Sequence, residues 1–150
     1  MVKARVALET VSLDLNGWDS HFAATALMNP LMKQLAEGLA AFRRDLGSDM
    51  GKVTVVVMTE FGRRVYQNVS FGTDHGRGSV MFVLGSEILG GRVIHKWKGL
   101  DSDRLEGPGD LAVVYNYRDV LAPVLMRHGG IEAMDTIFPE FSVSPLALYG

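Results

Sequence analysis

Apolar residues between positions 22 and 46 recur at spacings of three and four, which is the period of one face of an α-helix. Gly47 directly follows the last of them and is placed to end the helix. A continuous apolar run of strand length, Val53–Met58, comes next, and such runs are typical of strands buried on both faces of a parallel sheet. A long amphipathic helix followed by a fully apolar strand predicts an α/β fold. The apolar helix face consists of Leu31, Leu35, Leu39, Phe42 and Leu46.

Further strands and helices are indicated along the rest of the chain, separated by turn residues. Residues 60–78 form a long polar stretch with many glycines, and loops of this length are usually functional or mobile. The order of strand, helix, strand, long loop, strand and helix, without an internal repeat or a linker, predicts a single α/β domain over residues 1–150. The other predicted strands are residues 5–15, 80–84 and 92–94, the second helix is residues 117–128 with Pro123 inside it, and the tail 138–150 is expected to be coil.

Composition limits the kinds of partner and the types of metal ligand that we expect for this chain. The formal net charge is −2 and the basic residues are scattered, so we expect no binding to nucleic acid. No apolar stretch approaches the roughly 20 residues of a membrane span, and no signal peptide is visible, so we expect no membrane contact and a cytoplasmic location as expressed. Because the chain has no cysteine, any metal ligands must be imidazole and carboxylate groups.

Three polar segments, residues 17–21, 59–63 and 72–76, each come after a predicted strand. Ligands of open α/β sheets bind beyond the carboxyl ends of the strands, so we expect the three segments to converge at one edge. Asp19 and His21 are two positions apart, and this spacing puts both side chains on the same side of an extended backbone. One ion could therefore be held by both.

Asp74 and His75 are adjacent and lie among glycines, which allow the backbone to turn the imidazole towards a shared centre. Imidazole combined with carboxylate suits zinc, manganese or iron. A metal held by about three ligands, with one open position, lowers the pKa of a bound water to about 7. The predicted metal ligands are Asp19, His21, Asp74 and His75.

Each of these segments also has a purely structural interpretation. An Asp-x-His pair is common by chance, and an Asp-His pair beside glycine equally suits a turn with a polar cap. Glu60 equally suits a helix cap or a salt bridge to Arg63 or Arg64. His95 lies beside lysines on a solvated edge, and His128 closes a helix where a cation favours the local dipole, so we assign neither to the metal site.

The order of these motifs resembles the family called "domain of unknown function 1501". The similarity covers nearly the whole chain, and the Glu-Phe-Gly-Arg and Asp-His segments in this order are its most specific part. It is carried by Gly17-Trp18-Asp19-Ser20-His21, the amphipathic helix ending near residues 42–46, Val55–Arg63, Gly72-Thr73-Asp74-His75-Gly76, Gly85, Gly90-Gly91-Arg92-Val93, Trp97, Asp119-Val120-Leu121 and Phe138-Pro139.

The resemblance implies a branch of the alkaline phosphatase and sulfatase superfamily, in which metals lie at the carboxyl ends of a mostly parallel sheet flanked by helices. It implies a partial fold equivalent to the C-terminal half, without the first strand and the loop that carries a Ser or Thr nucleophile. Asp19, His21 and His75 correspond to one metal site, with Asp74 ligating or orienting His75. The second site is weakened, because Phe61 replaces a ligand of that site.

The resemblance implies a metal-dependent hydrolase of phosphate, phosphonate or sulfate esters of small molecules that uses metal-activated water, with zinc preferred over manganese. Glu60 would be a further ligand or a general base, and Arg63 would stabilise negative charge on the transferred group. The alternative is a non-catalytic remnant or assembly module that folds and binds metal without turnover. Half a sheet exposes strand edges and apolar faces, so we also expect a symmetric homodimer. Relatives are often exported, which leaves the natural localisation open.

Overall fold

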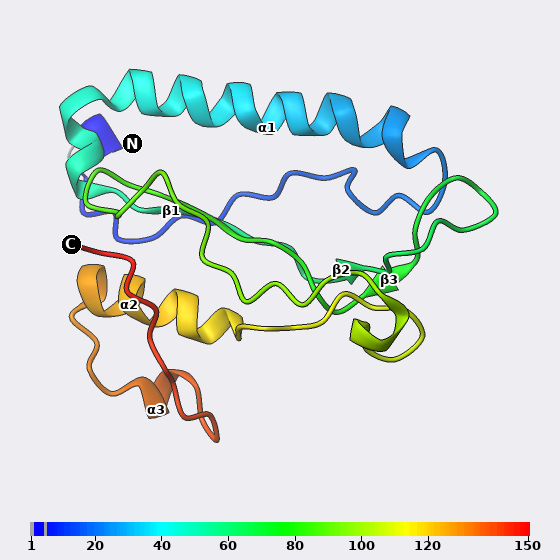
Figure 1. The fold of residues 1–150 in the computed structure, drawn as a ribbon. Coiled ribbons are helices and arrows are strands. Elements are labelled where there is room, and N and C mark those ends of the chain that lie inside the picture. The colour runs from blue at the N-terminus through cyan, green and yellow to red at the C-terminus, as the bar shows by residue number, and fades with distance from the viewer. Residues whose placement is uncertain (1, 5) are drawn as a thin grey trace.

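The computed structural model describes residues 2–4 and 6–150 and shows a mixture of helices and short strands (Figure 1). One long helix lies along one side of a two-stranded ribbon, and a shorter helix lies on the other side. The helices are α1 (Ala24–Leu46), α2 (Tyr117–Gly129) and α3 (Met134–Ile137), the 3-10 turns are η1 (Val2–Ala4), η2 (Gly47–Lys52) and η3 (Ser102–Arg104), and the strands are β1 (Val55–Val57), β2 (Gly62–Arg63), β3 (His75–Gly76) and β4 (Phe82–Leu84).

Both long helices confirm their predictions, and their ends show why. Helix α1 gives way to the turn η2 at Gly47, which adopts a positive φ of 53°. Helix α2 begins after Asn116, whose side chain accepts a hydrogen bond from the N–H of Arg118 at 3.0 Å. It contains Pro123 and ends at Gly130, which has a left-handed φ of 60°. Local residues therefore set the end of α1 and both ends of α2.

The start of α1 is held by a distant loop. The N–H groups of Ala23 and Ala24 donate to the carbonyls of Ser70 and Phe71, at 3.0 and 2.9 Å. These bonds satisfy donors that a helix N-terminus leaves without an intrahelical partner. Ala23 has a positive φ of 44°, a strained conformation for a residue with a Cβ, which the docking of the loop maintains.

The four strands lie along a single antiparallel hairpin. β1 pairs with β4, with Val55 facing Leu84, and β2 pairs with β3, with Gly62 facing Gly76. The register shifts by one residue between the two pairs, as a bulge produces. The hairpin tip, residues 64–74, docks on the start of α1. The segment expected to be a long loop, residues 60–78, is mostly irregular as predicted, and only β2 and β3 within it are strands.

The mostly parallel sheet expected from the sequence does not appear: every strand pair in residues 2–4 and 6–150 is antiparallel. A parallel connection needs a crossover of a dozen or more residues, usually a helix. Residues 58–81 contain no helix and lead the chain straight back. The apolar runs gave the positions of β1 and β4 and left their direction undetermined. The residues of these strands are half-buried or exposed, so the expected burial on both faces is also absent.

Two smaller strand predictions are also wrong. Residues 6–15 and 92–94 have no strand partner in the described part of the chain, and many of their side chains are exposed, including Leu13 and Val93. β-branched composition alone does not make a strand, because a strand needs a neighbour to complete its ladder. Arg5, the first residue of the predicted strand, lies outside the described residues. The tail, residues 138–150, is irregular as expected, apart from an isolated bridge.

The chain exposes much more surface than a folded monomer of its size. A compact protein of 16.4 kDa exposes about 7,500 Å², whereas this chain exposes 10714 Å². The excess is roughly 3,000 Å².

Among the described helices, none is both long enough and apolar enough to span a membrane. The buried apolar side chains are Leu46, Met50, Val120, Ala122 and Leu148.

Candidate metal centre

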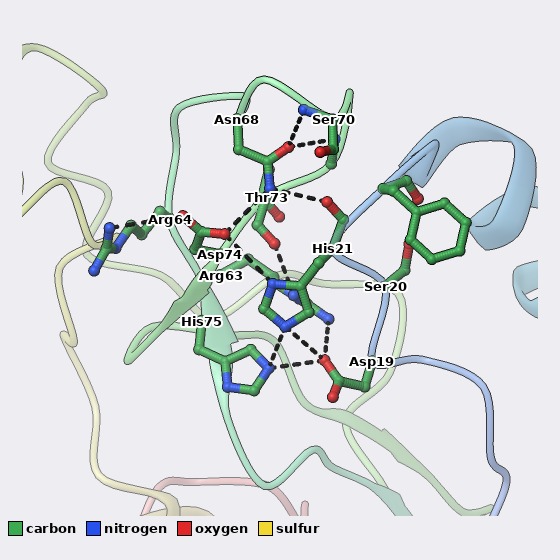
Figure 2. Close-up of polar contacts among 12 residues, drawn as sticks. Asp19, Ser20, His21, Arg63, Arg64, Asn68, Ser70, Thr73, Asp74 and His75 are labelled. Carbon is green, nitrogen blue, oxygen red and sulfur yellow. Dashed lines mark hydrogen bonds and ion pairs between the residues drawn. The ribbon is translucent and has the colours of Figure 1, made fainter.

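Three ligand-type atoms meet at the end of the ribbon where β2 and β3 lie (Figures 1 and 2). Oδ1 of Asp19 is 2.8 Å from Nε2 of His75 and 3.1 Å from Nε2 of His21. The two Nε2 atoms are themselves 3.1 Å apart. In the part of the chain that the structure describes, this is the one group of three or more His, Asp or Glu residues with ligand atoms so close together.

The triangle has the size and the chemistry of a metal-ligand set. Ligand atoms about 2.1 Å from one ion lie about 3.0–3.4 Å apart in octahedral or tetrahedral coordination, which is close to the distances observed here. A carboxylate oxygen and two imidazole nitrogens all carry lone pairs, which repel one another at this distance. A cation between the three atoms offsets that repulsion. Two imidazoles and one carboxylate suit zinc or manganese, so the residues fit a divalent metal.

Alternation along the extended segment before α1 explains why Asp19 and His21 meet. Ser20, between them, is buried and directs its hydroxyl to the carbonyl of Phe22 at 2.8 Å, away from the triangle (Figure 2). The two flanking side chains therefore share the opposite side, as their spacing predicted. His75 reaches them from β3, where its backbone faces Arg63 of β2.

Arg63 joins the two segments of the site. Its guanidinium donates to the carbonyl of Thr73 at 2.7 Å, to the carbonyl of Trp18 at 3.0 Å and to Oδ1 of Asp19 at 3.1 Å. The hydrogen bond with His75 is the largest cause that lowers the pKa of Asp19, and Arg63 adds to it. Both contacts favour the ionised form of Asp19.

Asp74 lies beside the triangle and contacts His21 rather than His75. Its Oδ1 is 3.4 Å from Nδ1 of His21, the ring nitrogen opposite the one in the triangle. A carboxylate at Nδ1 fixes the tautomer that leaves the lone pair of Nε2 free to ligate. The hydrogen bond from Asn68, at 3.1 Å, is the first cause that lowers the pKa of Asp74, followed by the contact with His21.

Two residues of the hairpin tip contribute to the site: Asn68, which was not singled out from the sequence, and Gly72, which was named only as part of the Asp-His motif. Asn68 donates to the carbonyl of His21 at 2.9 Å as well as to Asp74. Gly72 lies so close to the backbone of His21 that a Cβ would overlap the His21 carbonyl. An Asn followed four residues later by a Gly indicates a tight turn, but the sequence does not show what this turn touches.

Of the residues after β1, Phe61 lies at the site and Glu60 does not join the triangle. The Phe61 ring stacks on His75, with ring centroids 3.9 Å apart and planes inclined by 19°. Glu60 is exposed and forms no hydrogen bond or ion pair with any described residue. Phe61, which cannot ligate, thus restricts the orientation of the His75 ring instead.

A partly buried charge pair extends the network behind Asp74. Arg64 is 3.8 Å from Oδ2 of Asp74 and 3.7 Å from Oδ1 of the buried Asp110. Nε of Arg64 and Oδ1 of Asp110 form no hydrogen bond, so the pairing is electrostatic.

Neither of the other histidines joins the site. His128 contacts Thr54 at 2.8 Å, and His95 accepts a hydrogen bond from the backbone N–H of Trp97.

Comparison with known proteins identifies the family. No curated protein and no solved structure matches the chain. A family model described as "Protein of unknown function (DUF1501)" matches residues 2–137, which include the whole triangle and its supporting residues. The chain belongs to the DUF1501 family.

Proposed function

We propose that this chain is a metal-dependent hydrolase of phosphate, phosphonate or sulfate esters, with the metal held by Asp19, His21 and His75. The observation that carries the proposal is the triangle of ligand atoms, whose three sides measure 2.8–3.1 Å. Two imidazoles and a carboxylate suit both zinc and manganese. Zinc is the ion that we propose first, and manganese is the second choice. A metal held here would polarise an ester oxygen and activate water for attack.

The chain's own groups would prepare and surround this centre. Asp74 holds Nδ1 of His21, so that Nε2 faces the shared point. Arg63 donates one hydrogen bond to Asp19 and two to the carbonyls of Trp18 and Thr73. Its remaining N–H groups would be available to negative charge on a substrate. The side chains of the triangle are 46–59% exposed, which leaves room for an ester to approach from solvent. Glu60 is the proposed general base, an assignment that rests on its place in the motif.

The order of the ligands along the chain also supports a relationship to the alkaline phosphatase and sulfatase superfamily, which we propose as the ancestry of this chain. An Asp and a His from one loop with a His from a later loop is the arrangement expected of one metal site in that superfamily. In this chain those positions are Asp19, His21 and His75. The antiparallel ribbon carries the last of them.

The test is turnover by zinc-loaded protein of a panel of aryl phosphate mono-, di- and triesters and aryl sulfates. We expect hydrolysis of at least one class, lost in Asp19→Ala and His75→Ala and kept in His95→Ala, whose imidazole lies outside the triangle. Glu60→Gln should lower the rate by about 10²–10⁴-fold if it acts as a base. Equal activity in Asp19→Ala, His75→Ala and the unaltered protein would refute the assignment.

A second candidate function is that of an assembly module, and the exposed surface favours it. The excess of roughly 3,000 Å² per chain amounts to about 6,000 Å² for two chains, at the upper end of what large obligate dimers bury in total. We propose a second copy of the chain as the occupant, related by a two-fold axis. A zinc-binding protein that forms this dimer and hydrolyses none of the esters would support assembly in place of catalysis.

A further inference from the structure

The three ligands of the triangle come from two segments that are far apart in sequence. Asp19 and His21 precede α1, and His75 lies in β3, 54 residues beyond His21. Backbone hydrogen bonds join the two segments at residues 22–24, and two side chains bridge them beside the ligands. Arg63 is one bridge and holds Asp19, and Asn68 is the other and holds His21.

Asn68 uses its whole hydrogen-bonding capacity in this bridge (Figure 2). Its Nδ2 donates to the carbonyl of His21 at 2.9 Å and to Oδ1 of Asp74 at 3.1 Å. Its Oδ1 accepts from the N–H groups of Ser70 and Gly72, both at 3.0 Å. The partners of Nδ2 only accept and those of Oδ1 only donate, so the orientation of the amide is unambiguous.

The two bonds from Nδ2 act on the backbone and on the ring of His21 together. The first fixes the carbonyl of His21 against the hairpin tip. The second holds Asp74, whose same oxygen lies 3.4 Å from Nδ1 of His21. A ring whose Nδ1–H is directed to a carboxylate presents the lone pair of Nε2 on its other side. That side is where Asp19 and His75 lie.

We propose that Asn68 is the positioning residue of the metal site: it sets the backbone and the ring of His21 so that Nε2 meets Asp19 and His75. This inference rests on the proposed metal site and goes beyond it by assigning a role to a residue that contacts no ligating atom. The turn bonds to Ser70 and Gly72 hold the amide in place, and the bonds from Nδ2 hold the ligand.

The variant Asn68→Asp separates these two tasks. An aspartate keeps an oxygen for the N–H groups of Ser70 and Gly72, so the turn is retained. It replaces Nδ2 by an oxygen, which cannot donate to the carbonyl of His21 and repels the carboxylate of Asp74. The matched control is Asn116→Asp at the start of α2, where the side chain uses only its Oδ1, which the substitution preserves.

Two measurements test the role. Zinc affinity, from competition with a chromogenic chelator, should fall by about 10–100-fold in Asn68→Asp and stay unchanged in Asn116→Asp. Long-range ¹H–¹⁵N spectra of the metal-free proteins at about pH 8, where imidazole rings are neutral, should show His21 as the Nδ1–H tautomer. That tautomer should lose population in Asn68→Asp only, while circular dichroism and melting confirm that both variants fold.

The outcomes separate this inference from the proposed function. Zinc binding by the unaltered protein, with equal affinity and an unchanged His21 tautomer in Asn68→Asp, overturns the role of Asn68 and leaves the metal site in place. No zinc binding by the unaltered protein overturns the metal site, and the inference falls with it. A loss of affinity with a shift of the His21 tautomer, absent from the control, establishes Asn68 as the residue that positions His21.

Discussion

The Nε2 atoms of His21 and His75 lie 3.1 Å apart although 54 positions separate the two residues. Each ring has a second contact outside the triangle. Asp74 contacts Nδ1 of His21, and the ring of Phe61 stacks on the ring of His75. Asp19 completes the triangle from the same side as His21. Such a meeting of ligand atoms, supported by residues that contact only the outer sides of the rings, is typical of a metal centre.

Zinc binding is the first prediction. Protein purified without a histidine tag should bind about one zinc per chain, because one triangle offers three ligands and an open position. In His21→Ala and His75→Ala the affinity should fall by more than the roughly 10–100-fold typical of residues that only support ligands. His95→Ala is the control and should bind as the unaltered protein does. Metal content by mass spectrometry, together with chelator competition, gives the result. Undiminished zinc in a protein that carries both His21→Ala and His75→Ala would contradict it.

The ionisation of Asp19 is the second prediction. Its pKa lies below the ordinary 3.8, chiefly because of the hydrogen bond with His75. Replacing His75 by alanine should therefore raise the pKa of Asp19, which ¹³C spectra of the carboxyl groups measure directly. In the same titration Asn68→Ala should raise the pKa of Asp74, whose first cause of lowering is Asn68. Carboxyl titrations identical to those of the unaltered protein would show that these contacts are absent in solution.

The lowered pKa values of Asp19 and Asp74 determine how the stability of the fold changes with pH. A carboxylate with a lower pKa in the folded than in the unfolded chain stabilises the fold fully above the ordinary value. That contribution is lost as the pH falls through the lowered value. Metal uptake weakens over the same acidic range and also as the imidazoles become protonated, because ligands must be deprotonated to bind. Zinc affinity should therefore rise from about pH 5 to pH 8.

The close approach of Gly72 to His21 gives the third prediction. In Gly72→Ala the new Cβ meets the His21 backbone, so the hairpin tip must move and the protein should lose about 1–3 kcal/mol of unfolding free energy. Gly38 lies within α1 with open space around it, so Gly38→Ala should stabilise by about 0.5–1 kcal/mol. Chemical denaturation measures both. Zinc affinity should fall in Gly72→Ala alone, and equal affinity in the two variants would refute the role of this contact.

Association of two copies is the fourth prediction. The excess surface should be covered in solution, so sedimentation should give twice the 16.4 kDa mass of the chain. Leu13 is an apolar side chain that is 88% exposed, and Leu13→Asp should raise the dissociation constant at least about tenfold. Leu13→Met keeps an apolar side chain there and serves as the control. A monomer at every concentration would exclude a second copy as the covering surface.

The sequence alone determined those features of this protein that depend on neighbours along the chain. Helices α1 and α2 follow from a 3.6-residue period or from local caps, and the shared side of Asp19 and His21 follows from a spacing of two. His75 was also identified, because an imidazole among glycines in a long loop is a recognisable ligand candidate. These signals act over a few residues, so they survive without knowledge of the rest of the fold.

Only the tertiary structure decided which strands pair and which side chains from distant segments come into contact. An apolar run specifies burial and no direction, so the antiparallel course of β1 and β4 came from the hairpin that joins them. The sequence predicted Asp74 as a ligand or as the residue that orients His75, and the position of the hairpin tip made it the partner of Nδ1 of His21 instead. The role of Asn68 was invisible for the same reason: the carbonyl of His21, to which its amide donates, lies 47 positions earlier in the chain.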